Sequence, residues 1–197
     1  MKKIILFLLI ILGMGVFAPE PRASGHLRLA GGASTTSLSD STSATTHQSK
    51  YAIVGGAAVG LHVAPKIALE TGAWVLSRNY VATGYSVQTR WIAIPLEGRF
   101  QLLPSVNVGA GPYYAIASGN VSARTHTTKT FTYSALGLKE GDFGVTGSVY
   151  ADLLSLKVVS VFVEARYSSS VANAAKTGTL KYSDAIALIG LRLGEIK

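Results

Sequence analysis

Residues that commonly carry catalysis are few in this sequence and are not spaced for it. The four histidines are His26, His47, His62 and His126, and no two of them follow the HxxxH or HExxH spacing of a metal site. A Gly-x-Ser-x-Gly nucleophile motif does not occur, and the lack of cysteine excludes a thiolate nucleophile or ligand. We therefore expect no catalytic site, no bound metal and no cofactor.

Acidic and basic side chains instead fall where they could pair with one another. They share the polar faces of alternating segments with many small residues. The members of this predicted polar network are Glu70, Glu97, Arg99, Asp152, Glu164, Arg166 and Arg192. Ionised groups that face a narrow interior need partners of opposite sign or water, so the near balance of signs predicts a structural network that fills a lumen. Re-pairing of the same charges to open a pore is the functional alternative.

The elements that must position this network are strands. Apolar residues recur at every second position through most of the chain, which is the period of a β-strand. The expected strands cover residues 26–34, 50–64, 66–78, 86–102, 105–117, 142–154, 157–167 and 184–193.

Three features favour a barrel that turns its apolar face outward into lipid. Charged residues make up only 14% of the 197 residues, which is few for a water-exposed exterior. The polar face is rich in glycine, alanine and serine, which suit a narrow interior. Long gaps at 35–49, 79–85, 118–141 and 168–183 alternate with short ones at 64–66, 103–104 and 155–156. We predict an all-β, eight-stranded antiparallel up-and-down transmembrane β-barrel, with short periplasmic turns and longer external loops; a soluble exported lipid binder is the rival.

Aromatic residues on the predicted lipid face agree with that orientation. Tyr51, Tyr114, Phe143 and Tyr167 fall near the outer ends of their strands, and Phe100 falls near an inner end. Tyrosine at a membrane boundary keeps its ring in lipid and its hydroxyl in water. We therefore predict that these five residues form an aromatic girdle; ordinary surface aromatics are the alternative.

The first residues look like an export signal. Met1-Lys2-Lys3 is basic, and residues 4–18 form a continuous apolar run that is short for a bilayer-spanning helix. We expect a signal peptide over residues 1–23, cleaved near Ala23, and a barrel domain over residues 24–197. A buried helix or an uncleaved anchor is the alternative.

A resemblance to the small outer-membrane β-barrel family is carried by two pairs of segments. They are WIAIPLEGRF (91–100) with VNVGAGPYYAI (106–116), and DFGVTGSVYADL (142–153) with VFVEARYSSSVAN (161–173). The resemblance implies an eight-stranded outer-membrane barrel that depends on the barrel-assembly machinery and periplasmic chaperones during biogenesis. Many members end in an aromatic residue, whereas this sequence ends Leu193-Gly194-Glu195-Ile196-Lys197.

Two of the predicted loops have distinctive compositions. Residues 34–49 are dominated by serine and threonine and should be mobile. Alternation in residues 118–141 could extend a hairpin above the membrane. This loop carries Arg124, His126, Lys129, Phe131, Tyr133 and Lys139. Its basic aromatic tip could bind a surface partner or lipopolysaccharide phosphate, with a solvated variable loop as the alternative.

Together these features predict an outer-membrane protein of structural or surface-interaction type, with a lumen plugged by side chains. Its expected partners are outer-membrane lipid and lipopolysaccharide, and it is expected to be a monomer. A narrow, porin-like small-solute channel and a lipid-modifying enzyme are the alternatives, although the serines at 168–170 have no adjacent histidine. Nucleic acid is not an expected partner, because lysine and arginine are scattered rather than clustered.

Overall fold

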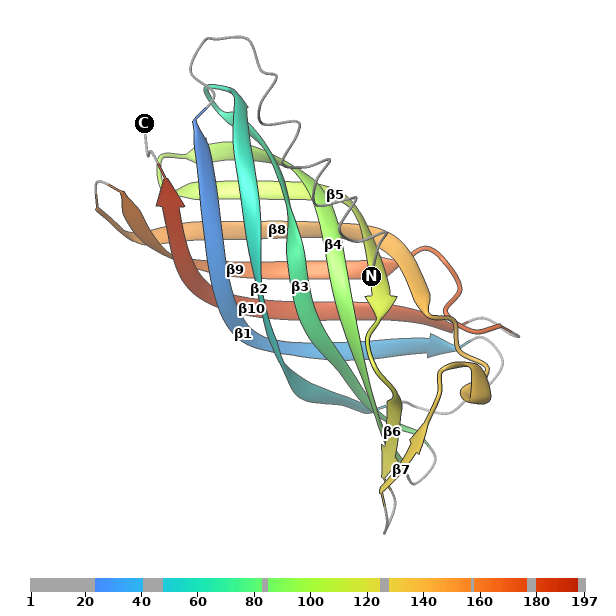
Figure 1. Cartoon of the computed structure of the whole chain (residues 1–197). Helices are drawn as coiled ribbons and strands as arrows, with labels where there is room; N and C mark the ends of the chain where they lie inside the picture. Colours follow the sequence, from blue (N-terminus) through green and yellow to red (C-terminus); the bar gives the residue numbers. More distant parts are fainter. Residues whose placement is uncertain are drawn as a thin grey trace.

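Eight long antiparallel strands form a closed barrel in the computed structural model, which describes residues 24–40, 48–82, 85–124, 128–156, 158–176 and 180–194 (Figure 1). The barrel strands are β1 (Gly25–Asp40), β2 (Gln48–Ala64), β3 (Ile67–Ala82), β4 (Tyr85–Leu103), β5 (Val106–Ala117), β8 (Gly141–Ser155), β9 (Val159–Ser170) and β10 (Leu180–Gly194). Each pairs with its neighbour along the chain, and β1 pairs with β10 to close the ring. The predicted fold class is confirmed. The expected signal peptide at 1–23 lies outside the described residues.

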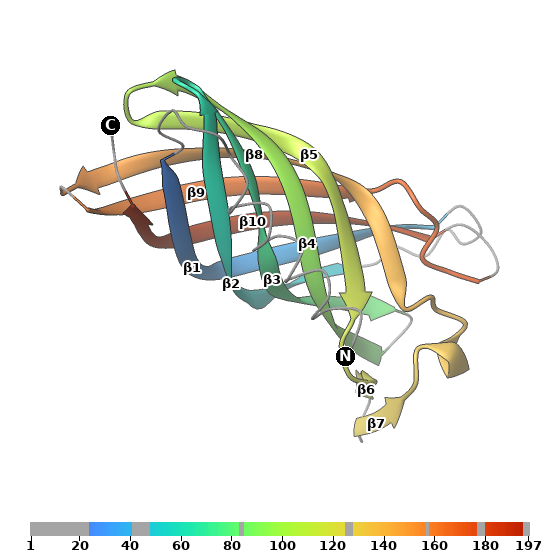
Figure 2. The ribbon, with the colours of Figure 1, turned by 45° about the horizontal axis from the view of Figure 1, so that its top comes forward.

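The two ends of the barrel differ in their connections. At one end, here called the short-turn end, tight connections join β2 to β3, β4 to β5 and β8 to β9. At the other, the long-loop end, β5 and β8 are joined through β6 (Val121–Arg124), β7 (Thr128–Phe131) and the 3₁₀ helix η1 (Ser134–Leu136). Figures 1 and 2 show the β6–β7 hairpin projecting beyond the barrel wall at this end. Among the described residues, no helix is long and apolar enough to cross a bilayer.

The strands extend further toward the long-loop end than the sequence predicts. The segment 34–49 was expected to be a mobile loop, but residues up to Asp40 continue β1 and pair with β10. The composition argument is wrong here because strand pairing with β10 gives a buried hydroxyl group of this segment a polar partner: Thr36 Oγ1 donates to Asp184 Oδ1 at 2.7 Å. The remaining residues, 41–47, lie outside the described part of the chain.

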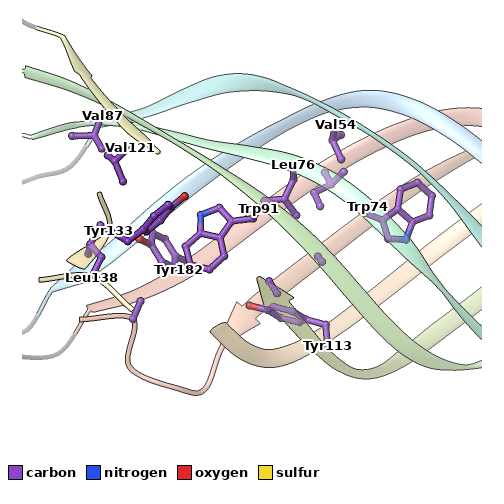
Figure 3. Packing of buried hydrophobic residues seen from close by; sticks show 14 of the residues in the cluster. Val54, Trp74, Leu76, Val87, Trp91, Tyr113, Val121, Tyr133, Leu138 and Tyr182 are labelled. Carbon is purple, nitrogen blue, oxygen red and sulfur yellow. The ribbon is translucent and has the colours of Figure 1, made fainter. Parts of the chain in front are cut away.

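Alternation sorts the side chains onto two faces as the pattern predicts. The outward face exposes large apolar residues along the strands, among them Leu29, Ile53, Val59, Leu69, Val75, Leu96, Val149 and Ile189. The inward face buries both tryptophans, Trp74 and Trp91, with Tyr113, Tyr182 and smaller apolar residues between them (Figure 3). The lumen is therefore packed with side chains, while the outer wall is apolar and uncovered.

Glycines on the inward face make room for these large rings. A Cβ atom at Gly190 would lie 2.6 Å from Ala30 Cβ and 2.8 Å from Phe162 Cζ. A Cβ atom at Gly144 would lie 2.8 Å from Tyr113 Cζ. All three distances are shorter than van der Waals contact allows, and the carbonyl oxygens of Leu29 and Ser169 are closer still, each at 2.2 Å. A side chain at either position would therefore displace the neighbouring strand as well as an aromatic ring. Gly147 is different, because the nearest atom to its Cβ position is the Gly109 carbonyl oxygen at 3.8 Å.

The pair Gly190→Ala and Gly147→Ala tests this packing. We expect Gly190→Ala to lower the free energy of unfolding by about 1–3 kcal/mol through overpacking. Gly147→Ala, in the middle of another strand, should change it by less than about 0.5 kcal/mol. Equilibrium urea unfolding, followed by fluorescence of the two buried tryptophans, measures both; equal effects of the two substitutions would contradict the packing argument.

Candidate functional site

Six charged side chains from four strands converge in the lumen and form the most concentrated group of ion pairs among the described residues. The members of this six-residue cluster are Arg28 (β1), Glu70 (β3), Glu97 and Arg99 (β4), and Glu164 and Arg166 (β9). All six are buried. Strand alternation brings them together, because each occupies an inward position of its strand.

The cluster alternates three guanidinium groups with three carboxylates. Arg28 binds Glu70 at 2.8 Å through Nη1 and also binds Glu164 through Nη2. The Nη2 atom of Arg99 lies 2.8 Å from Glu70, 3.0 Å from Glu97 and 3.4 Å from Glu164. Arg166 joins Glu97 at 2.8 Å and Glu164 at 2.9 Å. Because every charge has at least two partners of opposite sign, the cluster offsets the large cost of burying ions.

Aromatic rings lie against the guanidinium groups of the cluster. The Cζ atom of Arg28 lies 4.2 Å from the centroid of the Phe162 ring and 4.6 Å from that of Tyr150. Arg166 lies over Trp74 in the same way, at 5.1 Å. These cation–π contacts add to the ion pairs and fill the space around them.

A second, smaller cluster lies further along β3, toward the long-loop end. Arg78 is fully buried and lies between two carboxylates, 2.9 Å from Asp142 and 2.8 Å from Asp184. Tyr113 donates its hydroxyl hydrogen to Asp142 at 3.0 Å, and Ser170 donates to the same carboxylate at 2.9 Å. The Arg78 guanidinium is thus held by salt bridges and hydrogen-bonded carboxylates, an arrangement typical of a structural plug.

The predicted polar network proves to be two separate groups. Five of its seven residues belong to the six-residue cluster. Asp152 and Arg192 instead form their own pair near the short-turn end, at 2.8 Å, and Arg192 also donates to the Tyr150 hydroxyl at 2.9 Å.

The sequence reasoning missed four charged residues of the lumen. They are Arg28, Arg78, Asp142 and Asp184. Arg78 and Asp184 occupy polar positions of the alternating pattern, so the register alone could have found them. The alternating pattern of the first strand is too weak to assign its faces, so Arg28 escapes prediction. It lies two residues after the inward His26 and therefore on the same face.

The five predicted girdle residues all lie on the outward face and are exposed. Tyr51, Tyr114, Phe143 and Tyr167 lie toward the long-loop end of their strands, and Tyr114 pairs directly with Phe143. Phe100 lies toward the short-turn end of β4. Their positions match the predicted placement along the strands.

Loop residues cover the lumen at the long-loop end. Tyr133 packs edge-on against Trp91, with ring centroids 5.5 Å apart, and donates its hydroxyl hydrogen to the Arg90 carbonyl at 3.1 Å (Figure 3). Val121 and Leu138 join the same buried cluster. Burial raises the pKa of Tyr133, so its hydroxyl remains a neutral donor. This cover is tied to the β9–β10 connection by the Lys139 amide, which donates to the Ala174 carbonyl at 2.8 Å.

The space left in the lumen is small. A cavity of about 20 Å³ is lined by Trp74, Arg78, Tyr113, Arg166 and Asp184, with apolar residues around them, and it has room for about one water molecule. A second cavity, of about 50 Å³, lies at the short-turn end beside His26, His62 and Arg192. No group of three histidine, aspartate or glutamate residues in the described ranges is arranged to hold a metal ion.

Neutralising one carboxylate of the six-residue cluster should destabilise the barrel. Glu164→Gln leaves three guanidinium groups facing two carboxylates, and we expect a loss of about 3–5 kcal/mol in the free energy of unfolding. The matched variant Asp152→Asn breaks a single ion pair near the short-turn end and should lose about 1–2 kcal/mol. Urea titration measures both losses; a loss at Glu164 no larger than that at Asp152 would show that the cluster is not the main polar support of the lumen.

Comparison with known proteins identifies the fold. No protein-family model and no curated protein matches the chain. Among solved structures, Neisserial surface protein A (NspA) superposes with a TM-score of 0.51 at 11% sequence identity, over 86% of this chain and 96% of that one. The outer membrane protein OprG from Pseudomonas aeruginosa superposes with a TM-score of 0.51 at 12% identity, over 89% of this chain and 98% of that one. The closed ring of eight antiparallel strands and these two likenesses together show that the chain has the fold of the small eight-stranded outer membrane β-barrels.

Proposed function

We propose that this protein is an outer-membrane β-barrel of structural or surface-interaction type, whose lumen is closed to solutes. The observation that carries the proposal is the filled lumen. Two buried ion clusters, six large aromatic side chains (Trp74, Trp91, Tyr113, Tyr150, Phe162 and Tyr182) and a loop cover occupy its length. An eight-stranded barrel has an interior just wide enough for side chains, and here they occupy most of it.

The apolar outer wall supports the proposal that the barrel lies in a membrane. Its exposed residues include leucine, isoleucine or valine from six of the eight barrel strands, and Tyr114 and Tyr167 from β5 and β9. A contiguous apolar surface of this kind would associate or aggregate in water. Aromatic residues near both ends of the wall fit the two membrane–water boundaries. Export by the signal peptide expected over residues 1–23 is part of the proposal.

The charges at the long-loop end support an external orientation. The described loop residues there include Arg124, Lys129, Lys139 and Lys176, with Glu140 as an acidic neighbour. A basic surface beside the outer leaflet favours contact with phosphate groups of lipopolysaccharide. We therefore infer that the β6–β7 hairpin faces outward and that lipopolysaccharide is its partner.

No enzymatic reaction is part of this proposal. Ser168 Oγ donates to Thr146 Oγ1 at 3.0 Å, and Ser170 Oγ donates to Asp142 at 2.9 Å. These hydroxyl groups are buried in hydrogen bonds to other side chains, and neither is paired with a histidine that could activate it. Their geometry supports a structural role.

Conductance separates the closed barrel from the small-solute channel. Purified, folded protein inserted into planar lipid bilayers should show no steady, porin-like conductance, because the ion clusters and apolar side chains block the lumen. Folding is verified by a shift in gel mobility between unheated and heated samples. Stable channels of uniform size from such protein would overturn the closed-lumen proposal and favour opening by re-paired charges.

Protease access tests the orientation. Trypsin added to intact cells should cut at Arg124 or Lys129 in the β6–β7 hairpin and leave Lys66, in the β2–β3 turn, intact. Cutting at Lys66 without cutting at the hairpin would reverse the orientation. Reconstitution with lipopolysaccharide should slow cutting at Lys129, because bound phosphate groups would shield that side chain; an unchanged rate would argue against this partner.

A further inference from the structure

The lumen ends, at the short-turn end, in a polar cavity that the closed-barrel proposal does not use. Its volume is about 50 Å³. Its polar lining includes His26, His62, Lys66, Arg99, Asn107 and Arg192. These residues come from β1, β2, the β2–β3 turn, β4, β5 and β10, so the cavity exists only because the barrel closes.

The charges around this cavity have a positive excess. The nearby carboxylates are already paired, Glu70 with Arg28, Arg99 and the cavity residue His26, and Asp152 with Arg192. Lys66 is exposed at the rim and forms no ion pair with any other residue that the structure describes. Its ammonium group therefore adds a positive charge that no carboxylate offsets.

The two histidines of the cavity are already engaged in its wall. His62 Nδ1 lies 3.0 Å from the Ser24 carbonyl oxygen, so a hydrogen on this atom is used in that bond. His26 lies beside it, with ring centroids 5.5 Å apart, and its Nε2 atom lies 3.1 Å from Glu70 Oε2. The Asn107 amide and the Lys66 ammonium group supply further N–H donors.

Arg99 offers unused hydrogen-bond donors in the cavity wall, while its charge is shared among the carboxylates of the six-residue cluster. Its Nη2 atom serves all three carboxylates of the six-residue cluster, whereas Nε and Nη1 have no hydrogen-bond partner among the described residues. Arg99 is almost completely buried, and solvent ions screen a buried charge far less than an exposed one. An anion in the cavity that accepted hydrogen bonds from these N–H groups would be stabilised.

We propose that this cavity binds a small oxyanion of the phosphate class. The volume matches the space of about four water molecules, which suits a tetrahedral oxyanion and excludes a nucleotide or a sugar. Lys66 supplies the charge at the rim, and the Asn107 amide supplies a neutral donor inside. The site stands on the geometry of the short-turn end and does not depend on the closure of the rest of the lumen.

Calorimetric titration of the folded full chain with inorganic phosphate tests the proposal. The protein is held in a phosphate-free, uncharged detergent at constant ionic strength, with chloride as the control anion. Saturable binding of phosphate and none of chloride is the expected result. Absence of a saturable phosphate signal would overturn the proposal.

A matched pair of lysine variants separates a site from general charge attraction. Lys66→Gln should weaken phosphate binding roughly tenfold, the effect of losing one charged hydrogen bond. Lys181→Gln removes the same charge from an exposed position at the opposite end of the barrel, outside the loop surface proposed to meet lipopolysaccharide, and should leave binding unchanged. Asn107→Asp places a carboxylate in the cavity without changing its size and should abolish binding. Equal effects of the two lysine variants, or full binding by Asn107→Asp, would also overturn the proposal.

Phosphate at this site could come from solution or from a lipid headgroup. Glycerol 3-phosphate, titrated against bound phosphate, distinguishes the two sources. Competition at comparable concentration identifies phosphate esters as ligands and supports a headgroup source. Failure to compete restricts the same site to the free ion.

Discussion

Pairing of buried charges in a narrow lumen is the constraint on which the rest of this structure depends. Three guanidinium groups and three carboxylates lie together away from solvent, at N···O distances that include 2.8 Å for Arg28–Glu70 and Arg166–Glu97. Burying any one of them alone would cost several kcal/mol. The strands must therefore keep a register that brings all six to the same level, and a shift of one residue would turn each of them toward the outer wall.

The same register makes the outside apolar and the inside crowded. The large aromatic rings of the lumen need more room than an eight-stranded barrel would leave if all its inward side chains were of similar size. Glycines such as Gly144 and Gly190 provide that room opposite Tyr113 and Phe162. Small residues on the inward face are thus the counterpart of the large ones, and the plug is a packed core rather than a set of isolated ion pairs.

The two ends of the lumen are closed by different kinds of residues. At the long-loop end, apolar loop residues such as Tyr133 and Leu138 pack onto Trp91 and keep water out. At the short-turn end, where the connections are too short to fold back, the lumen opens on a polar cavity with Lys66 at its rim and unused Arg99 N–H groups in its wall. This asymmetry supports an inert role for one end of the lumen and a binding role for the other.

The sequence by itself determined the alternation, the strand order and the inward positions, because a period of two residues is a local property of an extended chain. It also placed Glu70, Glu97, Arg99, Glu164 and Arg166 on one face. It could not show that Thr36 continues a strand, because its hydroxyl group is satisfied only when β10 brings Asp184 beside it. Only the tertiary structure decided which charges meet, since Arg28 and Glu164 lie far apart in the chain and become neighbours when β1 and β10 close the ring.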